Sequence, residues 1–200
     1  MTRQRWVLAS GNAGKLAEMG ALLAELDIEL VPQSEYGVSD AVEDGVAFVD
    51  NALIKARHAA AITGLPAIAD DSGLAVDALG GAPGIYSARY GGVHGDDAAN
   101  NAKLLAALAD TPDSQRGGAF HCCLAATLAA DDPVPVIGHG VWRGRILREI
   151  RGAGGFGYDP LFWIDAENAS AGELSAHRKN AISHRGLAMQ HLIAQLRARG

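Results

Sequence analysis

Two adjacent carboxylates, Asp70 and Asp71, follow a short apolar run near the middle of the chain. An ionised carboxylate that leaves bulk water needs a hydrogen bond, an opposite charge or a metal ion. Mg²⁺ suits such a pair, because it takes oxygen ligands and is usually held by one or two carboxylates together with substrate phosphates. The pair, which we expect in a turn, therefore points to phosphate chemistry. A helix cap or a solvated turn is the simpler interpretation, since Asp is common in turns.

A glycine-containing segment near the start of the chain favours the same chemistry. A P-loop needs four residues between its first glycine and the Gly-Lys pair, followed by Ser or Thr, whereas this segment has two and continues with Leu16. Backbone N–H groups at a helix N-terminus still face an anion, and a lysine adds a point charge. The alternative is a solvated loop with a surface lysine. The segment comprises Ser10, Gly11, Asn12, Ala13, Gly14 and Lys15.

Two later segments add basic and aromatic groups. Ser183 precedes His184 and Arg185 at the start of a predicted helix, where cations oppose the helix dipole unless an anion offsets them. Arg185 paired with a surface carboxylate is the alternative. Phe156 stands between glycines, which leaves its ring face uncovered by neighbouring side chains. This pattern is typical either of a base-stacking platform or of a tight turn with a core phenylalanine.

Hydrophobic periodicity supplies the elements that must position these groups. A helix over 45–63 places one apolar stripe opposite a face that carries Asn51, Lys55 and His58. The stripe comprises Val46, Val49, Leu53, Ala56 and Ala60. Strands are expected at 6–9, 28–31 and 67–69, with an extension at 74–76 after the turn, and a hairpin at 119–130 and 134–147. Further helices are expected at 16–26, at 96–109 with Asp96 as N-cap, and from about 183 onward. This alternation predicts an α/β or mixed α+β fold with a central mixed sheet flanked by helices.

The bulk composition limits the classes of function. A chain of 200 residues with 48% hydrophobic residues fits a single domain over residues 1–200. The formal charge of −6 argues against nonspecific binding to nucleic acid. No apolar run has the length of a membrane helix. The cysteines, Cys122 and Cys123, are neighbours in an apolar run, so we expect buried thiols and a cytoplasmic protein.

The motifs, taken together and in order, resemble the inosine-triphosphate pyrophosphatase family and its bacterial dITP/XTP pyrophosphatase branch. The resemblance runs from about Val7 to Leu196. Its segments are Ser10–Lys15, Asp50–Ala52, Ala69–Asp77, Gly80–Tyr90, Gly155–Pro160 and Ser183–Gly186.

This resemblance implies an Mg²⁺-dependent homodimer, with an active-site cleft between two lobes, that hydrolyses ITP, dITP and XTP to the monophosphate and pyrophosphate. It implies that Asp71 is the general base and a metal ligand and that Glu43 is a second metal ligand. A lone acid before a helix is otherwise a partner of the helix dipole. The implied substrate-binding residues are Ser10 to Lys15 for the phosphates, Phe156, Gly157, Tyr158 and Asp159 for the base, and Lys179, His184 and Arg185 for both. Ser72 is also implied as a substrate-binding residue.

The residue types and their spacing are also compatible with two other functions. A nucleotide sensor that does not cleave its ligand would share the glycine loops, although clustered carboxylates would then repel the phosphates. A related pyrophosphatase acting on pyrimidine nucleotides would differ only in its base pocket. For the homodimer, the loop over 82–92 offers Ile85, Tyr86 and Tyr90, which either form an interface or fold back onto the core.

Overall fold

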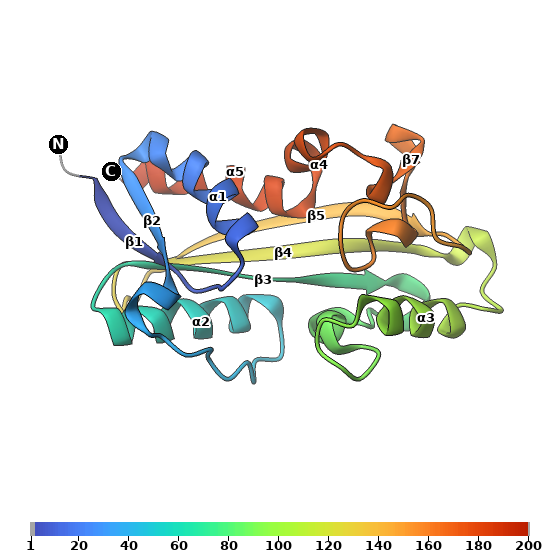
Figure 1. Cartoon of the computed structure of the whole chain (residues 1–200), viewed down its shortest axis with the longest axis horizontal. Helices are drawn as coiled ribbons and strands as arrows, with labels where there is room; N and C mark the ends of the chain where they lie inside the picture. Colours follow the sequence, from blue (N-terminus) through green and yellow to red (C-terminus); the bar gives the residue numbers. More distant parts are fainter. Residues whose placement is uncertain (1–2, 200) are drawn as a thin grey trace. The chain divides into compact units, whose positions relative to one another are not determined.

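The computed structural model describes residues 3–199, which form a mixed β-sheet with helices packed on it (Figure 1). Within these residues the sheet has seven strands in the order β2-β1-β3-β4-β5-β6-β7. β1 pairs in parallel with β2 and β3, whereas β6 pairs antiparallel with β5 and β7. The expected mixed sheet flanked by helices is therefore confirmed. The strands are β1 (Gln4–Leu8), β2 (Ile28–Pro32), β3 (Ala67–Val76), β4 (Gly117–Thr127), β5 (Val136–Ile146), β6 (Phe162–Ile164) and β7 (Ala169–Ser170).

Two compact units make up the chain. The first contains residues up to Asp71, Cys122–His139 and the residues from Ala188 on, and the second contains Ser72–His121 and Gly140–Leu187. The helices are α1 (Ala13–Leu23), α2 (Phe48–Thr63), α3 (Asp97–Ala107), α4 (Ala176–Ile182) and α5 (His184–Arg199). No helix within residues 3–199 is long and apolar enough to cross a membrane.

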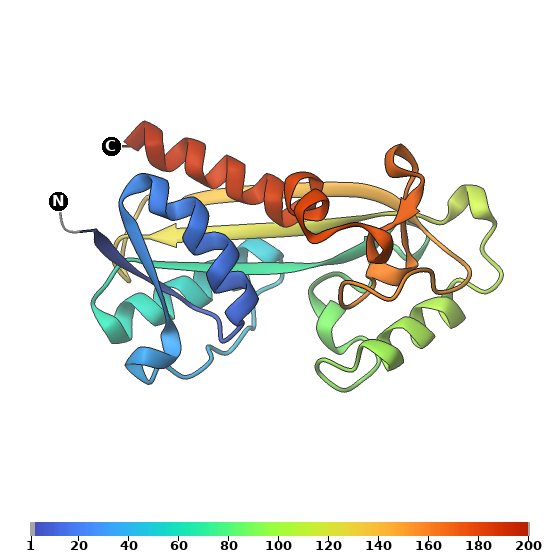
Figure 2. The ribbon, with the colours of Figure 1, turned by 45° about the horizontal axis from the view of Figure 1, so that its top comes forward.

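In the first unit the strands separate two apolar cores. Side chains alternate across a strand, so Leu8 and Ile68 face one core and Val7 and Ala67 face the other. Figure 2 shows α1 and α5 on one side of the strands, and α2 lies on the opposite side. Met19 of α1 joins the first core. The sheet in this unit is therefore buried on both faces.

The same alternation separates the two cysteines. Cys122 lies in the core beneath α1 and α5, whereas Cys123 lies in the core beneath α2. Both thiols are buried, and neither forms a disulfide. The prediction of buried thiols is confirmed, and the sheet itself keeps the two sulfurs apart.

The second unit has one core around aromatic side chains. Phe120, Trp142 and Phe162 come from β4, β5 and β6, and Leu104 of α3 packs with them. The Phe120 and Phe162 rings meet edge to face with centroids 4.6 Å apart. Tyr158, at the end of the loop over 154–158, belongs to this core.

The expected turn at Asp70 and Asp71 is wrong, because β3 runs without interruption from Ala67 to Val76. The two carboxylates are tolerated inside a strand because the alternation sends them to opposite faces, where each has a lysine partner. The prediction that Leu74–Val76 continues the strand is confirmed.

The second helix begins at Phe48 and not at Gly45 as expected. Val46, which the prediction placed in the apolar stripe, is 89% exposed. The reason is local: the Asp50 carboxylate accepts the N–H groups of Val46 and Ala47, so these residues cap the helix instead of extending it. The buried stripe consists of Ala52, Ala56, Ala59 and Ala60.

Other element predictions are confirmed, and one helix was not anticipated. Asp96 caps α3 by accepting the Ala99 N–H at 3.0 Å. The hairpin of β4 and β5 is closed by Asp132, whose carboxylate accepts the Leu128 and Val134 N–H groups. Sequence periodicity gave no signal for α4, a helix of seven residues that carries Lys179.

Candidate active site

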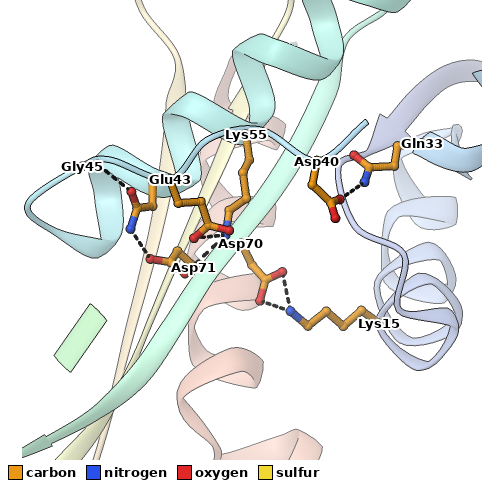
Figure 3. Close-up of polar contacts among 9 residues, drawn as sticks. Lys15, Gln33, Asp40, Glu43, Gly45, Lys55, Asp70 and Asp71 are labelled. Atoms are coloured by element: carbon orange, nitrogen blue, oxygen red, sulfur yellow. Dashed lines mark hydrogen bonds and ion pairs between the residues drawn. The ribbon is translucent and has the colours of Figure 1, made fainter. Parts of the chain in front are cut away.

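Asp71 lies in β3, where its carboxylate contacts two side chains of α2. Its Oδ2 accepts a hydrogen bond of 3.1 Å from Asn51 Nδ2, and its Oδ1 is 3.3 Å from Lys55 Nζ. The same ammonium is 3.2 Å from a carboxylate oxygen of Glu43. Figure 3 shows the carboxylates of Glu43 and Asp71 both directed toward the Lys55 ammonium. A strand, a helix and a loop thus bring two carboxylates to one cation.

Helix geometry explains why Asn51 and Lys55 act together. They are four residues apart on α2, so their side chains lie on one face. Asn51 also accepts the Gly45 N–H at 2.9 Å, which ties the loop bearing Glu43 to the helix (Figure 3). Sequence analysis placed Asn51 and Lys55 on one polar face but assigned them no role. It also missed that Asn51 is 1% exposed.

The environment of Asp71 favours its protonated form relative to an exposed aspartate. Burial raises the pKa of Asp71, and the neighbouring charge of Glu43 raises it further. Lys55 and the hydrogen bond from Asn51 oppose that shift. A carboxylate with a raised pKa is a stronger proton acceptor, which suits a general base.

Asp70 contacts a different lysine. Lys15 Nζ lies 2.8 Å from both carboxylate oxygens of Asp70, whose side chain is 1% exposed. Figure 3 shows this pair apart from the contacts of Asp71. Because neighbouring residues of a strand point to opposite faces, Asp70 pairs with Lys15 and Asp71 with Lys55.

The segment from Ser10 to Lys15 forms a capped helix start. Ser10 Oγ accepts the Asn12 N–H at 3.2 Å, and Asn12 Oδ1 accepts the Lys15 N–H at 3.0 Å as the N-cap of α1. Gly11 is exposed, Ala13 begins the helix, and a Cβ at Gly14 would lie 3.2 Å from Asn12 Oδ1. The predicted helix N-terminus is confirmed, and such a terminus presents N–H groups to an anion.

A second group of predicted residues lies in the second unit around Phe156. The Phe156 side chain is 59% exposed, so the interpretation as a core phenylalanine is wrong. Lys179 Nζ lies 4.6 Å and Arg185 Cζ 5.7 Å from its ring centroid. An exposed ring flanked by two cations has the character of a stacking platform for an electron-rich base.

Asp159 and Tyr158 hold this loop from within. The Asp159 carboxylate is buried, accepts the Phe156 N–H at 2.8 Å and pairs with Lys179. Tyr158 is buried, and its hydroxyl donates to the Ser87 carbonyl at 2.9 Å. Burial raises the pKa of Tyr158 well above its usual range. Both side chains therefore contact protein groups that shape the loop.

The remaining predicted residues have distinct surroundings. The His184 ring stacks on Phe120 with centroids 4.8 Å apart, and it is 5% exposed. Ser183 Oγ accepts the Gly186 N–H, so the predicted hydroxyl cap is confirmed. Ser72 follows Asp71 in β3 and is half-buried. Gly157 has φ +61°, a left-handed conformation that favours glycine.

Sequence analysis also missed Asp97 and Asn101, two residues of α3 that bind the peptide groups of Gly157. Their spacing of four residues at the start of a helix was the available signal. In the part of the chain that the structure describes, no three His, Cys, Asp or Glu side chains are clustered as a protein-only metal site would require.

Comparisons with known proteins agree over nearly the whole chain. Residues 6–195 match the model of the Ham1 family. The chain is 55% identical to a dITP/XTP pyrophosphatase from Shigella flexneri, over 97% of this chain and 98% of that protein. It is 56% identical to a dITP/XTP pyrophosphatase from Vibrio cholerae, over 93% of each. A solved HAM1 protein structure from Coxiella burnetii is 51% identical, with a TM-score of 0.93 over 98% of this chain and 99% of that one.

Proposed function

Because the chain belongs to the Ham1 family, we propose that it hydrolyses purine nucleoside triphosphates with deaminated bases, namely ITP, dITP and XTP. The products are the nucleoside monophosphate and pyrophosphate. Removal of these nucleotides cleanses the pool from which nucleic acids are made. That pool is cytoplasmic, so the proposal assigns the protein to the cytoplasm.

The single observation that carries the chemistry is the group of Asp71, Lys55 and Glu43. Asp71 takes a proton from a water molecule, whose oxygen then bonds to the α-phosphorus while the bond to the bridging oxygen of the β-phosphate breaks. The leaving pyrophosphate carries away the electron pair. Phosphoryl transfer leaves a protein mainly positioning and charge stabilisation to perform. The raised pKa of Asp71 supports its role as the base.

The donor set fits Mg²⁺. Glu43 and Asp71 offer carboxylate oxygens close to one ammonium, and Mg²⁺ is commonly held by one or two carboxylates together with substrate phosphates. These two residues would hold the ion, which when bound supplies charge neutralisation to the phosphates. Lys55 keeps the two carboxylates together by attracting both.

The remaining predicted residues bind different parts of the nucleotide in this proposal. We assign the phosphates to Ser10, Gly11, Asn12, Ala13, Gly14, Lys15 and Ser72, and the base to Phe156, Gly157, Tyr158 and Asp159. Lys179, His184 and Arg185 serve base and phosphates. In this proposal one nucleotide uses both groups of residues, in a cleft between two lobes. The capped start of α1 and the exposed Phe156 ring support the assignment.

A nucleotide panel with pyrophosphate detection tests the proposal. ITP, dITP and XTP should release pyrophosphate much faster than ATP or pyrimidine nucleotides, and EDTA should abolish the release. Tight binding of ITP without release would indicate a sensor instead. Preference for a pyrimidine nucleotide would contradict the assigned substrate class.

We also propose a homodimer. Within the loop over 82–92, Tyr86 is 56% exposed and lies under the Arg89 guanidinium, whereas Tyr90 packs against the core of its unit. An exposed tyrosine with a stacked arginine is typical of interface residues. Sedimentation at micromolar concentration should give about twice the 20.7 kDa chain mass. A mass near 20.7 kDa would rule out the dimer.

A further inference from the structure

Two side chains of α3 bind the backbone of a single residue, Gly157, beside Phe156. The Gly157 N–H donates to Asp97 Oδ2 at 2.6 Å, and the Gly157 carbonyl accepts from Asn101 Nδ2 at 2.9 Å. Asp97 and Asn101 are one turn apart, so they leave α3 from the same face. The helix thus holds both the donor and the acceptor of the same residue.

The backbone is fixed on both sides of the Phe156 side chain. On its N-terminal side the Phe156 N–H donates to the buried Asp159 carboxylate at 2.8 Å. On its C-terminal side Gly157, with φ +61°, is held by α3. The ring itself is 59% exposed, and its contacts are with the cations of Lys179 and Arg185 rather than with an apolar core. The hydrogen bonds on both sides of Phe156 hold the backbone from which the ring projects.

Asn101 makes its contact with Gly157 from a buried position, where a polar side chain is energetically costly. It is 6% exposed, and its Oδ1 atom is buried without a hydrogen-bond partner among the described residues. A buried polar atom without a partner is unfavourable, so the Oδ1 atom itself adds nothing to stability at this position. The hydrogen bond that Asn101 Nδ2 donates to the Gly157 carbonyl is the contact that explains an asparagine at this position.

We propose that Asp97 and Asn101 are positioning residues for base recognition, which act through Gly157 to hold the backbone that carries the Phe156 ring. This inference rests on the proposed function, because it assumes that a purine stacks on Phe156. A loosened ring must be ordered again each time a nucleotide binds. Loss of either contact should therefore weaken nucleotide binding and leave the chemistry at Asp71 unchanged.

The variants Asp97→Ala and Asn101→Ala test this role. Each should raise KM for ITP about three- to tenfold and leave kcat within about twofold, since one hydrogen bond is lost outside the reacting centre. Without nucleotide, amide hydrogen exchange in a peptide covering 153–158 should be about tenfold faster than in the wild type.

Two matched variants separate positioning from general destabilisation. Asp96→Ala removes the N-cap of α3 without touching Gly157, so it should lower the melting temperature but leave KM and exchange at 153–158 unchanged. Asp97→Asn keeps an oxygen that accepts the Gly157 N–H, so it should restore KM to within about twofold of the wild type.

The outcomes are distinguishable. An active wild type combined with unchanged KM and exchange in both alanine variants overturns the positioning role. An equal rise of KM in Asp96→Ala also overturns it, because loosening of the helix would then suffice. A wild type that releases no pyrophosphate from any purine triphosphate contradicts the proposed function, and the exchange measurement still reports whether α3 holds the loop.

Discussion

At the scale of single residues, the amide of Asn51 connects the parts of the candidate active site. Its oxygen accepts the Gly45 N–H from the loop that carries Glu43, and its nitrogen donates to Asp71. The distance between the two carboxylates therefore depends on one buried side chain as well as on Lys55. A residue that looks like a solvated helix position in the sequence is part of the site.

Replacement of Asp71 by Asn should reduce turnover of ITP by ~10² or more, because the proton acceptor is lost while the shape is kept. Pyrophosphate release at saturating Mg²⁺ measures the effect. Asp110→Asn, an exposed carboxylate outside both groups, is the control and should retain full activity. Near-normal turnover by Asp71→Asn would rule out its role as general base.

Replacement of Arg185 by Ala should lower the preference for ITP over ATP by about tenfold. Inosine carries an oxygen at C6, whereas adenine carries an amino group there. A hydrogen-bond donor of the protein directed at C6 therefore gains a hydrogen bond with inosine but faces another donor in adenine. Arg185 is 8% exposed and lies over the Phe156 ring, which supports its role as that donor. The ratio of kcat/KM for ITP and ATP is the measurement.

The comparison variant for Arg185 is Phe156→Ala. Loss of the ring should weaken both nucleotides about equally, because stacking does not depend on the group at C6. If Arg185→Ala instead lowers activity on ITP and ATP by the same factor, Arg185 serves the phosphates. Base recognition then depends on Lys179 or His184.

At the scale of elements, the start of α2 determines where Glu43 lies. The residues over 45–47 pack closely against the helix, and a Cβ at Gly45 would lie 2.5 Å from the Asp50 Cβ and 2.7 Å from Asn51 Oδ1. Such approaches are too close for any side chain without movement of the loop or the helix. Glycine at this position is therefore required by space and not by an unusual φ.

Replacement of Gly45 by Ala should destabilise the protein by about 1–3 kcal/mol, the usual cost of an overpacked site. Displacement of Glu43 should also raise the Mg²⁺ concentration needed for half-maximal activity. Urea unfolding and a Mg²⁺ titration measure the two effects. Gly20→Ala in α1 is the matched control, because its Cβ would meet only ordinary contacts at 3.9 Å. It should be neutral or stabilising by up to about 1 kcal/mol.

At the scale of the whole molecule, stability at high pH should reflect the buried cysteine in the core beneath α2. Burial raises the pKa of Cys123 to about 11, and the nearby charge of Asp71 contributes. Between the ordinary thiol pKa and that value, the unfolded chain loses a proton that the folded chain keeps. Folding stability must therefore fall as the pH rises through this window.

Urea unfolding of the wild type and of Cys123→Ala tests this dependence. The free energy of unfolding should fall more steeply for the wild type than for the variant between about pH 9 and pH 11. If the free energy of unfolding changes with pH in the same way for both proteins, Cys123 has the same pKa in the folded and the unfolded state. Below about pH 8 the two curves should differ only by the constant cost of the smaller side chain.

The local elements and the chemistry could be predicted from the sequence, because both depend on short-range patterns. The Asp96 cap, the hairpin and the apolar helix faces follow from residue types and spacing. The ordered motifs from Ser10 to Arg185 also sufficed to indicate the family. The position of Glu43 before a helix and the glycines around Phe156 were visible in the chain itself.

Only the tertiary structure decided how the polar residues are divided among partners. Asp70 and Asp71 look alike in the sequence, but an uninterrupted β3 turns one toward Lys15 and the other toward Lys55. The contact between Asn101 and Gly157 joins residues 56 positions apart, which no local pattern encodes. Such contacts depend on how strands and helices pack, and packing is a property of the whole chain rather than of any segment.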